Sequence, residues 1–386
     1  MTNIKQHYIK TSIFLTNCFL IFIILSCIFQ ILYIFEKKIL NLSNKTSLTK
    51  KYGEEVFKKA YPKYSTDQIN ILLKERDDLP LEYEPYTQFK EKAKIGTYYN
   101  ISPFGYRIHS NNGPFPLDNN NTNIFIFGGS TSFGYGVEDN ATIPAILQKK
   151  LQQTNKNIFV YNFGRGGYFS TQERILFENL IISGIQPDIA IFLDGLNDFS
   201  FQDNLPLHTK KIEKMFNTEG LITKQNAIKR LIESYPLIKI YQHYKQWRAS
   251  SQIQLNSTQI ENNNSIIEKN IQIYKNNIDL INIIAKAKNI KTYFFLQPIP
   301  TYKLDPKQHL FYQGINNQIH SAKFGYISLK KKIDSNKISL PQNFFWLADI
   351  QKNIIDFPLY IDSCHYSAEF SKFIAKKIAK ELEKNI

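Results

Sequence analysis

The sequence predicts a three-layer α/β/α domain with a central parallel sheet, preceded by a transmembrane helix. Three observations lead to this fold class. Short apolar runs alternate with helical stretches from residue 123 onward, glycine-rich turns follow the first of these runs, and an uncharged apolar run lies near the N-terminus. Strands that alternate with helices form a parallel sheet with helices on both faces. The chain has 386 residues, 43% of them hydrophobic, which suffices for one such core with an anchor and insertions besides.

The N-terminal apolar run covers residues 13–35 and contains no charged residue. It is about as long as the roughly 20 residues with which a helix crosses hydrocarbon. A cleaved signal peptide would have a shorter apolar core and a small-residue cleavage site, whereas Glu36-Lys37-Lys38 follows this run directly. We therefore expect residues 13–35 to be retained as a single-pass anchor. Residues 24–27 resemble a lipoprotein box only faintly, because the apolar run continues well beyond Cys27.

The orientation of this anchor has two interpretations. More lysines follow the helix, from Lys37 to Lys51, than precede it, at Lys5 and Lys10. The positive-inside rule taken literally would then place the domain in the cytoplasm. Long domains, however, translocate largely regardless of their charge. We therefore predict a membrane protein whose large domain is periplasmic or otherwise extracytoplasmic.

The charge and cysteine content exclude several classes of protein. The net charge of +15 would suit an anionic partner, but the excess consists mostly of scattered lysines. No stretch interleaves arginine with aromatic residues as nucleic-acid platforms do, so no nucleic-acid partner is expected. The three cysteines, two of them in the apolar run, can form neither a disulfide framework nor a CxxC metal site. We expect neither a cofactor nor a metal.

The elements of the domain, residues 123–386, follow from the pattern of apolar residues. Strands are expected at residues 123–127, 158–163, 188–194, 291–297 and 344–349. Helices are expected at residues 143–153, 171–183, 266–288 and 368–383. Residues 199–264 form an insertion with a helix around 227–247, and this insertion is either a lid or substrate wall, or a solvated excursion.

Residues 36–122 are expected to form a membrane-proximal stalk and a lead-in to the domain. Helices are plausible around residues 50–59 and 66–76, before the prolines at 80 and 85. The stretch 96–122 is rich in Gly, Pro and Asn, which is typical of turns.

The first polar motif follows the first strand and reads Gly128-Gly129-Ser130-Thr131. Open α/β sheets bind ligands at the carboxyl ends of their strands, which is where this turn lies. Small residues at 128 and 129 allow a sharp turn that leaves the Ser130 side chain exposed. A Gly-Gly-Ser turn alone is more often a plain loop than a nucleophile.

Two further motifs follow the next two strands. Gly164-Arg165-Gly166-Gly167 provides glycines whose backbone N–H groups can point into a cleft as anion donors. It is set aside as a dinucleotide fingerprint, because it follows the second strand and no acidic residue comes at the right distance. After the third strand, the carboxamide of Asn197 can donate to a developing oxyanion. Each motif alone could be an ordinary turn.

The last motif is Asp362-Ser363-Cys364-His365, directly before the final helix. This spacing lets a carboxylate bind one imidazole nitrogen and leaves the other nitrogen facing the cleft, as a general base requires. A lone Asp-x-x-His could equally be a helix cap beside a surface histidine. Cys364 is more readily explained by packing, since His365 already has Asp362 as its partner.

Together, the four motifs resemble the signature blocks of SGNH (GDSL-type) hydrolases, and the resemblance spans residues 123–384. The signature Ser, Gly, Asn and His of that family fall on Ser130, Gly167, Asn197 and His365. The resemblance implies a flavodoxin-like sandwich and a serine nucleophile, with Asp362 completing the triad. It also implies an oxyanion hole from Ser130, Gly167 and Asn197. The family's first block usually reads Gly-Asp-Ser, whereas Gly129 stands at the Asp position here, a version similar to membrane-bound or exported members that include polysaccharide O-acetyltransferases.

The resemblance implies a serine-dependent ester hydrolase or O-acyltransferase. We expect it to act on small acyl esters, acetyl above all, of a cell-envelope carbohydrate, with a membrane partner that supplies acyl groups if it is a transferase. The alternatives are a lipid esterase at the membrane surface and a non-catalytic glycan-binding or assembly protein on the same fold. The intact set of four motifs counts against the last of these.

Overall fold

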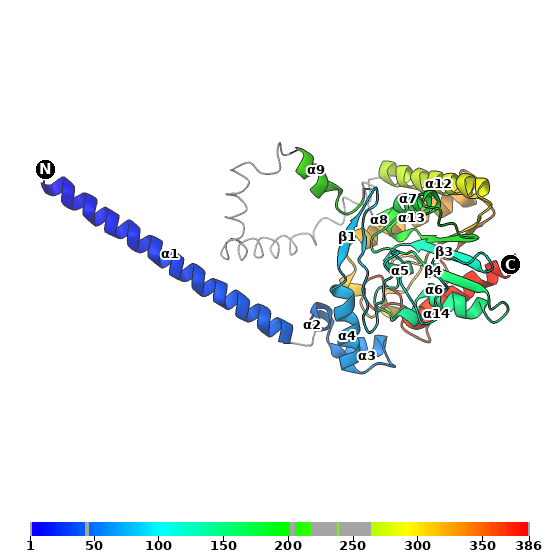
Figure 1. Cartoon of the computed structure of the whole chain (residues 1–386), viewed down its shortest axis with the longest axis horizontal. Coiled ribbons are helices and arrows are strands. Elements are labelled where there is room, and N and C mark those ends of the chain that lie inside the picture. Colours follow the sequence, from blue (N-terminus) through cyan, green and yellow to red (C-terminus); the bar gives the residue numbers. More distant parts are fainter. Residues whose placement is uncertain (1, 43–45, 201–204, 218–237, 239–263, 385–386) are drawn as a thin grey trace. The chain divides into compact units, whose positions relative to one another are not determined.

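The computed structural model describes residues 2–42, 46–200, 205–217, 238 and 264–384 (Figure 1). The chain divides into two compact units, the first comprising residues 1–44 and 210–259 and the second comprising residues 45–209 and 260–386. Apart from residue 238, the helix expected around residues 227–247 lies outside the described residues. The fold of each unit is therefore given by itself.

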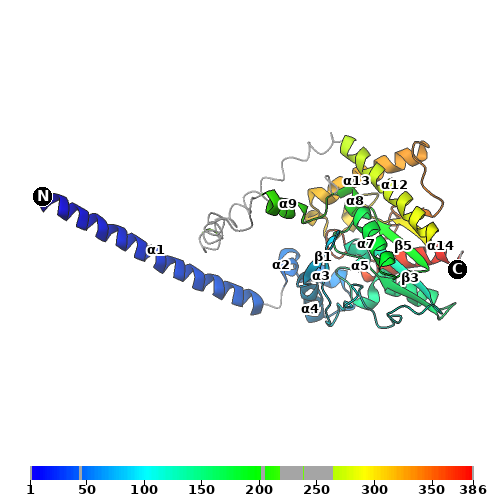
Figure 2. The ribbon, with the colours of Figure 1, turned by 45° about the horizontal axis from the view of Figure 1, so that its top comes forward.

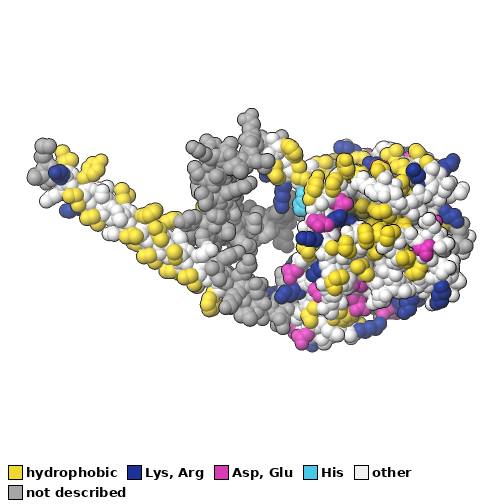
Figure 3. All heavy atoms as spheres, viewed as in Figure 1, with side chains coloured by type: hydrophobic (Ala, Val, Ile, Leu, Met, Phe, Trp, Pro, Cys, Tyr) yellow, Lys and Arg dark blue, Asp and Glu magenta, His cyan; other side chains and the backbone are white. Residues whose placement is uncertain are grey.

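The first unit contains one long apolar helix, α1 (Thr2–Leu42), and most of the short helix α9 (Thr209–Asn217). The predicted apolar run at residues 13–35 lies entirely within α1. By length and composition, Ile4–Leu32 is the one described helix able to cross a membrane. Its large apolar side chains are exposed, and hydrophobic atoms follow the helix along its length in Figure 3. An exposed apolar surface of this extent needs a partner such as lipid.

The second unit is built on a five-stranded sheet. Its strands are β3 (Thr122–Gly128), β4 (Ile158–Asn162), β5 (Ile189–Asp194), β6 (Lys291–Leu296) and β7 (Phe344–Trp346). All neighbouring strands are parallel, and their order is β4-β3-β5-β6-β7. Counted within this sheet the order is 2-1-3-4-5, the flavodoxin-like arrangement of doubly wound folds. The predicted parallel sheet is confirmed.

Helices cover both faces of the sheet, as expected for a three-layer sandwich (Figures 1 and 2). One face carries α6 (Ile143–Leu151) and α14 (Ala368–Leu382). The other carries α7 (Ser170–Ile182), α12 (Asn264–Ala287) and α13 (Asn317–Asp334). Helix α13 was not among the predicted elements, and it begins after its N-cap residue Asn316. Shorter helices are α5 (Ser130–Phe133), α8 (Leu196–Ser200) and three 3₁₀ turns, at Asp139–Ala141, Pro306–Gln308 and Tyr312–Gly314.

The two faces of the sheet are packed with different side chains. The isoleucines of β3, Ile124 and Ile126, face α6 and α14, whereas the intervening phenylalanines face the other layer. The ring of Phe127 stacks on that of Phe192 at 4.9 Å between centroids, and Phe192 stacks on Phe294 at 5.2 Å. Strands covered on both faces consist of near-continuous apolar residues, because both alternating sets of side chains are buried.

Residues 46–109 differ from the expected stalk, because they belong to the second unit and pack against its other elements. This segment, here called the N-terminal cap, contains the elements α2 (Ser47–Tyr52), α3 (Glu54–Ala60), α4 (Thr66–Asp77), β1 (Leu81–Glu84) and β2 (Gln88–Glu91). Phe57, Leu72 and Leu73 are buried in a cluster that also includes Phe133 and Ile361. The helical spacing of Ile69, Leu72 and Leu73 places them on one face of α4, and this face is buried against the rest of the second unit.

Phe57→Ala tests whether the cap stabilises the unit. Phe57 is 1% exposed, and its ring lies 5.1 Å from that of Phe311. Deleting a buried aromatic ring leaves a cavity, so we expect the free energy of unfolding to fall by about 3 to 4 kcal/mol. Guanidinium unfolding of the detergent-solubilised protein measures this change. Ile71→Ala is the control on α4, since Ile71 is 46% exposed, and its effect should stay below about 0.5 kcal/mol. Equal effects of the two changes would contradict an integral cap.

Candidate active site

The predicted site residues meet at the carboxyl edge of the sheet. Ser130 begins α5 directly after β3, Gly167 lies in the loop after β4, and Asn197 lies in α8 after β5. Asp362 and His365 lie in the loop between β7 and α14. Because parallel strands end at the same edge, loops distant in sequence become neighbours there.

The Ser130 turn is held by its neighbours on the sheet. The Thr131 hydroxyl donates to Oε1 of Gln297 at 2.7 Å, and the Ser132 hydroxyl donates to the Leu193 carbonyl at 3.1 Å. A Cβ atom on Gly129 would lie 2.6 Å from Nδ2 of Asn197, so only glycine lets that amide approach the turn this closely. The glycine that departs from the usual Gly-Asp-Ser block therefore has a steric role here.

Ser130, His365 and Asp362 form one hydrogen-bonded chain. Nε2 of His365 lies 2.8 Å from the Ser130 hydroxyl oxygen, and Nδ1 lies 2.7 Å from Oδ2 of Asp362. The side chains of His365 and Asp362 are 16% and 9% exposed, so these hydrogen bonds are largely shielded from water while a small part of the imidazole stays accessible. This is the geometry in which an imidazole can take a proton from a hydroxyl while a carboxylate holds the ring.

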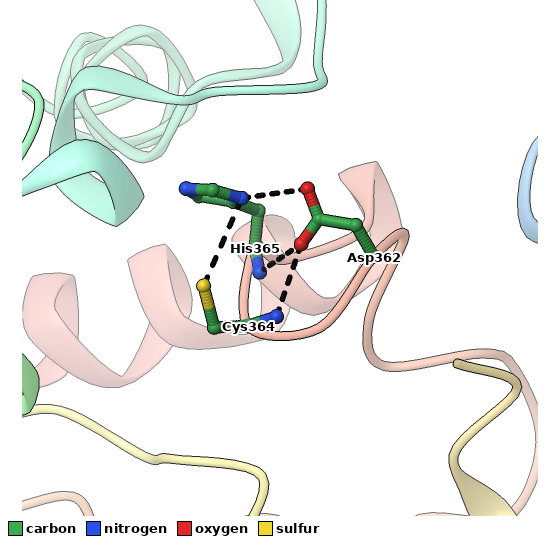
Figure 4. A group of neighbouring side chains, drawn as sticks. All are labelled: Asp362, Cys364 and His365. Atoms are coloured by element: carbon green, nitrogen blue, oxygen red, sulfur yellow. Dashed lines mark hydrogen bonds and ion pairs between the residues drawn. The ribbon is translucent and has the colours of Figure 1, made fainter. Parts of the chain in front are cut away.

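The loop around Asp362 is organised by its own carboxylate (Figure 4). Oδ1 accepts the backbone N–H groups of Cys364 at 3.0 Å and of His365 at 2.9 Å. Oδ2 remains for the imidazole, which Figure 4 shows turned toward it. One oxygen thus fixes the turn and the other orients the ring.

The buried charges of this chain shift each other's ionisation. Burial alone would raise the pKa of Asp362, but His365, and then Arg76, outweigh burial and hold this pKa well below its ordinary value. Burial alone would lower the pKa of His365, but Asp362, and then Cys364, together outweigh burial and raise this pKa above its ordinary value. Asp362 is therefore ionised at neutral pH. An imidazole can accept a proton only in its neutral form, so the capacity of His365 to take a proton from Ser130 falls as the pH falls through this raised pKa.

Asn197, in α8, lies beside the loop that contains Gly167. Nδ2 of Asn197 donates to the carbonyl of Tyr168, the residue after Gly167, at 2.6 Å. The second amide hydrogen remains available to a ligand. Gly167 has φ +76°, a conformation that favours glycine. The structure thus places Asn197 beside both the Gly167 loop and the Gly129-Ser130 turn.

The Asp198 carboxylate connects Ser170, at the start of α7, with Gly195, directly before α8. Its Oδ1 accepts the N–H and the hydroxyl of Ser170, at 3.1 and 2.5 Å, and its Oδ2 accepts the N–H of Gly195 at 3.2 Å. Burial raises its pKa, with Ser170 and Gly195 opposing this shift. Asp198 therefore fixes the start of α7 relative to α8, the short helix that contains Asn197. The sequence reasoning assigned no role to Asp198, whose contacts become visible only in the folded structure.

Three charged residues of the cap reach the site and were missed by the sequence analysis. Arg107 donates through Nη1 to the Gly134 carbonyl at 2.6 Å, just after α5. Glu91 accepts the N–H of Gly166 at 2.8 Å and the hydroxyl of Tyr135 at 3.0 Å. Arg76 contacts Asp362. The available signal was weak, because Arg76 and Glu91 lie in the charged segment expected to be a membrane-proximal stalk and Arg107 lies in the stretch expected to form turns.

One group of side chains in the described part of the chain could hold a metal ion, namely Asp362, Cys364 and His365, whose ligand atoms lie within 4.8 Å of one another. The hydrogen bond between Asp362 and His365 already uses two of these atoms. A metal there would replace the bond that orients the imidazole. The Cys364 sulfur lies 3.9 Å from Nδ1 of His365, and the side chain packs against the hydrophobic core.

No protein-family model matches this sequence, and no curated protein does either. Among solved structures, the neighbours are GDSL-type lipolytic proteins and acetylxylan esterases. A G-D-S-L family lipolytic protein from Desulfitobacterium hafniense is 13% identical, with 67% of this chain and 99% of that chain covered and a TM-score of 0.36. An acetylxylan esterase mutant from Geobacillus stearothermophilus is 13% identical, with 68% and 94% covered and a TM-score of 0.36. The esterase EstA from Pseudoalteromonas sp. is 14% identical, with 68% and 98% covered and a TM-score of 0.33.

Proposed function

We propose that this protein is a serine-dependent ester hydrolase or O-acyltransferase with Ser130 as nucleophile. The observation that carries the proposal is the hydrogen-bonded chain from Ser130 through His365 to Asp362, at 2.8 and 2.7 Å. A non-catalytic binding protein has no need of a serine hydroxyl held against an imidazole that is itself held by a buried carboxylate. This arrangement therefore favours an enzyme over a glycan-binding or assembly protein.

The reaction follows from these groups. His365 takes the Ser130 proton as the hydroxyl oxygen attacks the ester carbonyl, and the resulting imidazolium is stabilised by Asp362. The backbone N–H groups of Ser130 and Gly167 and the Asn197 amide bind the tetrahedral oxyanion. His365 then protonates the leaving alcohol, and an acyl-enzyme remains. Water releases the acid in a hydrolase, whereas a sugar hydroxyl accepts the acyl group in a transferase.

We further propose that the substrates are small acyl esters, acetyl above all, of a cell-envelope carbohydrate. Helix α1 would anchor the enzyme in the membrane, with the catalytic unit on the extracytoplasmic side. A membrane partner would supply acyl groups if the enzyme is a transferase. The exposed apolar helix would equally suit a lipid esterase, so phospholipids belong in the test.

The experiment compares three kinds of substrate with the full-length protein in detergent. We expect release of acetate from p-nitrophenyl acetate and from acetylated oligosaccharides, but little release of fatty acid from phospholipid vesicles. The Ser130→Ala protein is the matched control, and it should be inactive on every substrate. Faster cleavage of phospholipid than of acetyl esters would favour the lipid esterase. Transfer of labelled acetyl to an added oligosaccharide would identify a transferase.

A further inference from the structure

Arg76 reaches the proposed triad from the N-terminal cap. It lies in the last turn of α4, and its Nη1 donates to Oδ2 of Asp362 at 3.1 Å. The two residues are 286 positions apart in the sequence. The side chains of Arg76 and Asp362 are 7% and 9% exposed, so water screens their interaction little.

The contact uses the oxygen that also binds the imidazole. Oδ2 of Asp362 accepts from Nδ1 of His365 at 2.7 Å as well as from Arg76, while Oδ1 is occupied by two backbone N–H groups. The rest of the guanidinium is held by Asp77, whose Oδ1 accepts from Nε at 2.9 Å and from Nη2 at 2.7 Å. Arg76 is thus fixed with one N–H directed at the carboxylate of the triad.

The groups that face this carboxylate and imidazole come from several elements. Besides Arg76 and His365, Asp362 interacts electrostatically with Tyr61 of the cap and with His309. Burial keeps both in their neutral forms at pH 7, because it raises the pKa of Tyr61 and lowers that of His309 to about 4. His365 is faced by Asp362, Cys364, the Ser130 hydroxyl and the ring of Tyr135. Arg76 is thus the permanent positive charge beside the triad, among the groups that the structure describes there.

We propose that Arg76 is a positioning residue that completes the triad from outside the catalytic core, holding Asp362 in place and limiting how strongly this carboxylate stabilises the imidazolium of His365. This inference rests on the proposed function. A nearby positive charge disfavours a second one, so Arg76 keeps more of His365 neutral, and able to accept the Ser130 proton, than Asp362 alone would.

Arg76→Gln tests this role through the pH dependence of ester hydrolysis. Loss of the positive charge leaves Asp362 less compensated, so the pKa of His365 should rise. We expect the acid limb of kcat/KM to move to higher pH by roughly half to one unit. The plateau at high pH should change less, because there His365 is neutral in both proteins. Arg76→Lys, which keeps the charge, should restore most of the limb.

Glu75→Gln is the matched control on the same helix. Glu75 holds the cap together by accepting the N–H groups of Thr97, Tyr98 and Tyr99 at 2.8 to 3.1 Å, and it is not among the groups that face Asp362. This variant should leave the acid limb in place even if stability falls. A lower plateau with an unmoved acid limb in Arg76→Gln would make Arg76 merely structural and overturn the proposal.

A second variant and an NMR titration test the role of Arg76 independently of the Arg76→Gln kinetics. If Arg76→Gln does not fold, Asp77→Asn provides a second test at a side chain that is 37% exposed. This change removes the carboxylate that partly neutralises Arg76, so the acid limb of kcat/KM should move to lower pH. An unmoved limb would overturn the proposal. NMR titration of the His365 imidazole, assigned with His365→Ala, reports the same shift without any substrate. If the wild type cleaves no ester but Arg76→Gln still raises this pKa, the proposed function fails while the role of Arg76 stands.

Discussion

Ser130→Ala is expected to lower acyl-ester turnover by roughly 10⁵-fold and to abolish labelling by a fluorophosphonate probe. In the proposed reaction the serine oxygen forms the covalent bond to the acyl group, and alanine offers no atom in its place. The site should otherwise stay intact, because the turn is held by Thr131 and Ser132. Steady-state hydrolysis of p-nitrophenyl acetate and gel-based detection of the probe measure the two effects.

The other triad positions provide the controls for this result. His365→Ala should be nearly as damaging, whereas Asp362→Ala should retain some activity, because the carboxylate only orients and stabilises the imidazole. The double change of Ser130 and His365 should be scarcely worse than either single one, since the base has nothing to activate once the nucleophile is missing. A Ser130→Ala protein that still labels would show that another residue is the nucleophile.

Asn197→Ala is expected to lower kcat by about a hundredfold or more with little change in KM. The amide contributes mainly when negative charge develops on the substrate oxygen, which happens in the transition state. Its position between the Gly129-Ser130 turn and the Tyr168 carbonyl supports this role. Kinetics with an acetyl ester, together with the temperature of thermal unfolding, separate loss of catalysis from loss of structure.

Two outcomes would contradict this role for Asn197. Unchanged kcat would remove the residue from the oxyanion site. A large fall in unfolding temperature would instead mean that the bond to Tyr168 holds the two loops together. Ser170→Ala is a useful comparison, because Ser170 connects Asp198 to the start of α7 and has no predicted contact with the substrate. It should change stability more than kcat.

The sheet and its site were predictable because their signals are local in the sequence. The apolar runs that form β3, β4 and β5 are buried on both faces, so each appears as an almost uninterrupted set of hydrophobic residues. Polar residues directly after such runs must lie at the carboxyl edge of a parallel sheet. The link between Asp362 and His365 spans three residues, so spacing alone suggested it.

The N-terminal cap was not predictable in the same way. Residues up to 95 carry many charges between short apolar positions, which favoured a membrane-proximal stalk, and the Gly-, Pro- and Asn-rich residues 96–122 favoured turns. In the structure, Phe57, Leu72 and Leu73 are buried against the rest of the second unit. These side chains are buried by residues that are distant in the sequence, such as Phe133 and Ile361, so the sequence of the cap alone does not predict their burial. Helix α13 was missed for a related reason, since its polar and basic residues obscure the buried stripe.

By itself, the sequence determined the strands of the sheet, the apolar N-terminal helix and the candidate residues Ser130, Asn197, Asp362 and His365. Each of these depends on periodicity or on spacing over a few residues. Only the tertiary structure decided that a cap contributes Arg76, Glu91 and Arg107 to the same site. Arg76 and Asp362 are 286 residues apart, and a buried ion pair over that distance is formed by chain packing. No local pattern distinguishes such an arginine from one that simply ends a helix in water.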